Sequence, residues 1–117
     1  MLTAETLRQF GANVSEGVAR CLGDEEFYID LVKSTIPDER IDELDRLIAE
    51  KNYDKAFEIA HALKGMYGNI SITPIYDPIA EMTDLLREKK DADYSSFIAK
   101  AKEQKRKLVE IANSRRG

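Results

Sequence analysis

The spacing of the apolar residues constrains this chain more than any other feature of its sequence. Apolar side chains recur at steps of three and four residues along almost the whole chain, and alternation with a period of two is rare. This pattern predicts an all-α fold. The expected helices cover about 2–10, 16–22, 24–37, 41–51, 54–70, 74–90 and 93–113.

The longer helices and their short links indicate how the chain is organised. Helices of three to five turns joined by short connections are typical of an antiparallel four-helix bundle, here with one or two short helices before it. The sequence has no repeat and no linker rich in glycine or serine, so we expect a single domain over 1–117. A chain of 117 residues buries enough surface to fold without a disulfide or a structural metal.

Charge and cysteine content exclude several classes of protein. The 18 basic and 22 acidic residues give a net charge of −4, which argues against a general nucleic-acid binder. Cys21 is the only cysteine, so an internal disulfide and a cysteine-based zinc site are excluded, and no metal site is expected. No apolar run approaches the roughly 18 residues of a membrane span, and no signal peptide opens the sequence. We therefore expect a cytoplasmic protein.

The single histidine, His61, lies outside the apolar stripe of the helix predicted over 54–70. At about 100° per residue, it points roughly 140° away from the centre of that stripe. Lys64, Gly65, Gly68 and Phe57 fall within about 60° of it. The helix therefore carries a histidine, a lysine, two glycines and an aromatic residue on the face opposite its apolar stripe.

Two of these residues are unexpected in a helix. Each glycine costs about 1 kcal/mol relative to alanine in a helix interior. The absence of a side chain at Gly65 and Gly68 leaves room for another surface to approach the backbone, although close packing against a neighbouring helix is the alternative. Phe57 is either a partly covered residue of the bundle or part of a docking patch.

The chemistry of this arc suits phosphoryl transfer. A neutral imidazole is a nucleophile near pH 7, and Lys64 places a positive charge one turn away, where phosphoryl oxygens can be neutralised. The chain has no phosphate-binding loop for a nucleotide, so the phosphoryl group must come from a partner protein. A surface histidine without this chemistry is the plainest alternative.

These residues resemble a known family. The segment 61–65, His-Ala-Leu-Lys-Gly, is similar to the His-x-Leu-Lys-Gly signature of histidine-containing phosphotransfer (HPt) domains. The segment 17–28 resembles the N-terminal part of the family, and 56–60 and 69–70 also fit its pattern. One departure is Ser71, where the family usually has glycine.

The resemblance implies a role for each matching residue. His61 is the implied phosphoacceptor, Lys64 stabilises the phosphoryl group, and Gly65 and Gly68 clear space for a receiver domain. Thr83 takes the place of a glutamine or glutamate that binds the inner ring nitrogen in the family. The chain itself needs no cofactor, because Mg²⁺ is expected on the partner receiver.

The resemblance also implies the partners. We expect a monomeric phosphoryl carrier that exchanges phosphate with response-regulator receiver domains downstream of a hybrid sensor histidine kinase. It has no ATP-binding site and no kinase activity of its own. The main alternative is a non-catalytic helical adaptor that binds receivers without phosphate exchange. A domain cut from a larger hybrid kinase is a further possibility.

Overall fold

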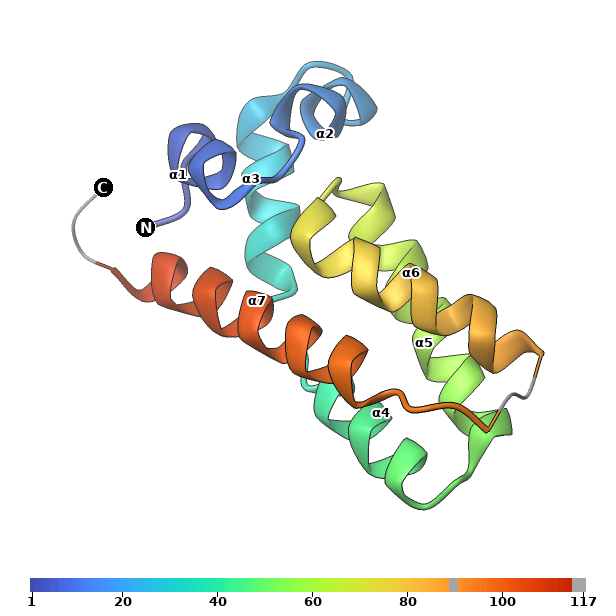
Figure 1. The fold of residues 1–117 in the computed structure, drawn as a ribbon. Coiled ribbons are helices and arrows are strands. Elements are labelled where there is room, and N and C mark those ends of the chain that lie inside the picture. The colour runs from blue at the N-terminus through green and yellow to red at the C-terminus, as the bar shows by residue number, and fades with distance from the viewer. Residues whose placement is uncertain (89–90, 115–117) are drawn as a thin grey trace.

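The computed structural model describes residues 1–88 and 91–114, and it confirms the all-α fold (Figure 1). The described part contains no strand. The described residues form three N-terminal helices of 7 to 10 residues, followed by four helices of 10 to 19 residues. They are α1 (Ala4–Phe10), α2 (Val14–Arg20), α3 (Glu25–Ser34), α4 (Arg40–Ala49), α5 (Tyr53–Asn69), α6 (Thr73–Arg87) and α7 (Ser95–Asn113). The predicted end of the sixth helix at 89–90 lies outside the described residues.

Helices α4 to α7 form the bundle. Contacts join α4 to α5, α5 to α6, α6 to α7 and α7 back to α4, so the four helices close a ring around one core. Successive helices run in opposite directions (Figure 1). The largest fully buried side chains of the bundle include Leu63, Tyr67, Ile79, Met82 and Leu108. Within the described residues, no helix is both long and apolar enough to cross a bilayer.

The three N-terminal helices pack against the end of the bundle where α5 turns into α6 (Figure 1). Tyr28 of α3 is fully buried, and its hydroxyl donates to the carbonyl of Ile70 at 2.8 Å. Gly17 of α2 lies against the Tyr28 ring so closely that a Cβ there would be 2.2 Å from Cε1. The amide of Asn13 donates to the Ser71 carbonyl at 2.9 Å. The N-terminal helices therefore brace the α5–α6 turn.

Short polar side chains determine where several of these helices begin. The side chain of Asn13 accepts a hydrogen bond from the amide of Glu16, and that of Asn52 accepts one from the amide of Lys55. Each bond satisfies an amide that has no partner within its own helix. Because Asn52 is the cap, α5 begins at Tyr53, and its register places His61 in the middle of the helix.

Candidate functional site

The burial pattern of α5 separates a core face from an open face. Ala56, Ala60, Leu63 and Tyr67 are buried against the other bundle helices. His61 and Gly65 are exposed, and Phe57, Lys64 and Gly68 are half-buried. The division agrees with the one expected from the helical periodicity, because a straight helix keeps residues three and four apart on one side.

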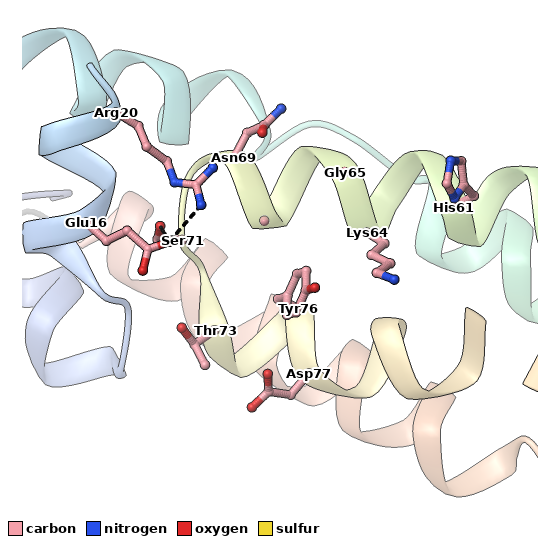
Figure 2. Close-up of a pocket in the computed structure, with 11 residues that line it drawn as sticks. Glu16, Arg20, His61, Lys64, Gly65, Asn69, Ser71, Thr73, Tyr76 and Asp77 are labelled. Carbon is pink, nitrogen blue, oxygen red and sulfur yellow. Dashed lines mark hydrogen bonds and ion pairs between the residues drawn. The ribbon is translucent and has the colours of Figure 1, made fainter. Parts of the chain in front are cut away.

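A cleft opens beside this face, between α5, α6 and α2 (Figure 2). Its lining includes His61, Lys64 and Gly65 from α5 and Tyr76 from α6. Lys64 extends from α5 toward α6, and the ring of Tyr76 rises from α6 toward α5 (Figure 2). The structure thus brings together the histidine, the lysine and both glycines, while Phe57 lies one turn before His61, outside the lining of this cleft.

The two glycines have different surroundings. A Cβ built on Gly65 would have no other group within 4 Å, so this position faces open space. A Cβ built on Gly68 would lie 3.0 Å and 3.3 Å from two ring carbons of Tyr76. Gly68 therefore accommodates a side chain of this same chain, as the packing alternative proposed, whereas Gly65 leaves the helix backbone accessible to another molecule.

The ring of His61 is stacked on the ring of Phe57. Their centroids are 5.7 Å apart, and the two planes are inclined by 22°. The guanidinium of Arg87, on α6, lies over the Phe57 ring at 5.8 Å from its centroid. Within residues 1–88 and 91–114, neither imidazole nitrogen takes part in a hydrogen bond. Stacking is the contact that the structure gives this ring.

Thr83 does not hold the His61 ring in this structure. It is fully buried, and its hydroxyl donates to the carbonyl of Ile79, one turn earlier on α6, at 2.6 Å. The side chain therefore satisfies its own helix. Arg87 contacts Phe57, and in the antiparallel helices Thr83 and His61 each lie one turn from that contact in the same direction along the bundle, so the two are at a similar level. The Thr83 hydroxyl is nevertheless directed to the α6 backbone.

The far end of the cleft is a region of paired charges (Figure 2). A carboxylate oxygen of Glu16 accepts from Arg20 at 3.0 Å and from the hydroxyl of Ser71 at 3.2 Å. Ser71 has φ of +54°, a left-handed conformation that favours glycine. The glycine that the family usually has at this position thus has a physical basis, and in this chain the serine that replaces it donates a hydrogen bond to Glu16.

Sequence reasoning missed Tyr76 and Arg87. Both are on α6 and reach α5 only because of the register between the two antiparallel helices. One signal was available, since Arg87 follows Thr83 by one helical turn and therefore lies on the same side of α6. Tyr76 carried no comparable signal.

Comparison with known protein families agrees with this site. The family model of the Hpt domain matches residues 37–113, which contain α4 to α7 together with His61 and Lys64. The chain belongs to the Hpt domain family. Membership implies a phosphotransfer-type role in two-component signalling, in which Hpt domains work with response-regulator receivers. No curated protein and no solved structure is found to match the chain.

Proposed function

We propose that this protein carries a phosphoryl group on His61 between the aspartates of receiver domains. The observation that carries the proposal is the open face of α5 inside the family match. There the only histidine is exposed, a lysine follows by one turn, and Gly65 leaves the backbone uncovered. A partner surface can approach such a face closely enough for direct transfer.

The transfer itself is a substitution at phosphorus. The unprotonated nitrogen of the His61 imidazole attacks the phosphoryl group of an aspartyl phosphate, so that an N–P bond forms and the P–O bond to the carboxyl group breaks. The electron pair of that bond leaves with the receiver carboxylate. The proton on the other ring nitrogen stays in place during this step. Transfer to a second receiver is the same step in reverse.

The residues around His61 would assist by charge and by space. The Lys64 ammonium is one turn from His61 and can neutralise the phosphoryl oxygens as their charge rearranges. The receiver would supply the Mg²⁺ that binds the other oxygens. Because the phosphoryl group comes from a receiver that a hybrid sensor kinase has charged, this chain needs no nucleotide site.

Transfer from a panel of radiolabelled phospho-receivers tests this proposal. We expect label to move to the wild type within seconds to minutes and to move more slowly to Lys64→Gln. The matched control is Lys100→Gln, which removes an exposed lysine of α7 outside the lining of the cleft and should leave the rate unchanged. Equal rates for the wild type and Lys64→Gln would remove the proposed role of Lys64.

A second candidate function is the non-catalytic adaptor. The observation in its favour is that the Thr83 hydroxyl is directed to Ile79, so the hydrogen bond that the family resemblance implied for the ring of His61 is absent from the described residues. An adaptor would bind receivers with the same affinity after His61→Gln and would take no label from any receiver that binds it.

A further inference from the structure

We infer that Phe57 and Arg87 are positioning residues that hold the His61 imidazole in the orientation needed for transfer. The inference rests on the proposed function. It assigns the pair a role in the rate of the phosphoryl step and not in the affinity for the receiver.

An exposed histidine on a helix is poorly restrained by its own torsions. Its χ1 angle has two accessible wells in a helix, and χ2 is broad, so an unsupported ring samples several orientations. In many sites a hydrogen bond to one ring nitrogen selects the orientation. Here Thr83 donates to Ile79, and within the described part of the chain no group bonds to either nitrogen of His61.

The Phe57 ring provides the restraint that remains. Phe57 precedes His61 by four residues on α5, the spacing at which helical side chains meet. The rings are 5.7 Å apart and nearly parallel, with 22° between their planes. This offset-stacked arrangement is a preferred geometry for aromatic pairs.

Arg87 secures Phe57 from the neighbouring helix. Its guanidinium is 5.8 Å from the centroid of the Phe57 ring, within the range of a cation–π contact, and is paired with Asp84 at 3.3 Å. Phe57 is half-buried and also packs against the core. The stack therefore connects the His61 ring to both α5 and α6 and not only to its own helix.

Positioning and docking predict different kinetics. If Phe57 orients the nucleophile, its loss lowers the maximal rate of transfer, because fewer encounters place the nitrogen in line with phosphorus. If Phe57 anchors the receiver, its loss raises the receiver concentration at half-maximal rate. If Phe57 only packs, its loss lowers the stability of the fold and changes neither quantity.

The test uses the full chain with Phe57→Leu, Phe57→Tyr, Arg87→Gln and the control Phe97→Leu. Phe97 is another half-buried phenylalanine that packs against the core, but it lies on α7. Two measurements are made on each variant. One is single-turnover transfer over a range of phospho-receiver concentrations, and the other is the NMR shifts of the His61 ring protons, which respond to the ring current of Phe57.

We expect Phe57→Leu to lower the maximal rate about tenfold and to leave the half-maximal receiver concentration within about twofold. Phe57→Tyr should restore the rate, because it keeps the aromatic ring. Arg87→Gln should lower the rate about threefold, the effect of losing an exposed cation–π contact. Phe97→Leu should have no effect. The His61 ring protons should shift in Phe57→Leu and return toward their original positions in Phe57→Tyr.

Three results would overturn the inference. A raised half-maximal concentration with an unchanged maximal rate would make Phe57 a docking residue. Unchanged kinetics in Phe57→Leu would leave it a packing residue. Unmoved His61 ring protons in that variant would show that the stack does not form in solution. If the wild type accepts no phosphoryl group at all, both the proposed function and the positioning role of Phe57 are wrong. The NMR shifts of the His61 ring protons still show in that case whether the two rings stack.

Discussion

Substituting the two glycines of α5 one at a time tests both the geometry of the cleft and its openness. Gly65 lies in the interior of the helix, where alanine gains about 1 kcal/mol of helix propensity, whereas Gly68 is the last residue but one of α5, where the gain is smaller. The surroundings then separate them. A Cβ at Gly65 has nothing within 4 Å, so Gly65→Ala keeps the whole gain, which corresponds to a rise in Tm of about 3–6 °C for a domain of this size.

Gly68→Ala should gain less. Its Cβ would lie 3.0 Å from a ring carbon of Tyr76, which must move by a few tenths of an ångström, and a net change between about 0 and 0.5 kcal/mol follows. The assay is urea unfolding monitored by circular dichroism, with the same m value in all variants. An alanine at Gly65 that is neutral or destabilising, or a larger gain at Gly68, would refute the reasoning.

The same position links stability to function. Gly65→Gln should also be at least as stable as the wild type, because glutamine is a better helix former than glycine and its side chain enters open space. Under the proposed function it should nevertheless block transfer, since the side chain occupies the surface that the receiver approaches. Normal transfer by this variant would show that the open backbone at Gly65 is not needed.

Three further predictions concern stability. Gly17→Ala should lower the free energy of unfolding by about 2–3 kcal/mol, because its Cβ would be 2.2 Å from the buried ring of Tyr28; a neutral result in urea unfolding would contradict that packing. Leu22→Gly should raise it by about 0.5–1 kcal/mol, because Leu22 is 98% exposed and has φ of +57°; a loss of stability would show an unrecognised role for its side chain. Hydrogen bonding from Arg40 lowers the pKa of Asp38, so the Asp38 carboxylate stabilises the fold fully above its unfolded-state pKa of about 4 and loses that contribution as the pH falls through the lower folded-state value. Urea unfolding at several pH values should therefore show the wild type losing its extra stability over Asp38→Asn between about pH 5 and pH 2. A stability difference that stays constant with pH would exclude the pair of Asp38 and Arg40 as the source of that extra stability.

The division of α5 into an exposed face and a buried face was predictable from the sequence, because it depends on helical periodicity alone. The helical angle separates His61 and Gly65 from Leu63 and Tyr67 without any knowledge of the other helices, and the burial of these residues agrees. The family assignment was predictable because its signature, the segment 61–65, lies within a turn and a half of one helix and does not depend on how the helices pack.

The contacts between α5 and α6 could not be predicted from the sequence, because they depend on the register between the two helices. The contact of Gly68 with Tyr76 and that of Phe57 with Arg87 each join α5 to α6. The α5–α6 turn, in which Ser71 is in the left-handed region, connects the two helices, and residue spacing within one helix carries no information about the register between them. The family resemblance that placed Thr83 beside His61 likewise specified a level along the bundle but not the direction of the hydroxyl.

The central claim is that His61 carries the phosphoryl group, and the stability of the linkage tests it most directly. Wild type and His61→Gln are incubated with the same labelled phospho-receiver, and the label is then followed in acid and in alkali. We expect label on the wild type alone, lost in acid and retained in alkali, as is typical of phosphohistidine. Label that His61→Gln also acquires, or that survives acid, would contradict it.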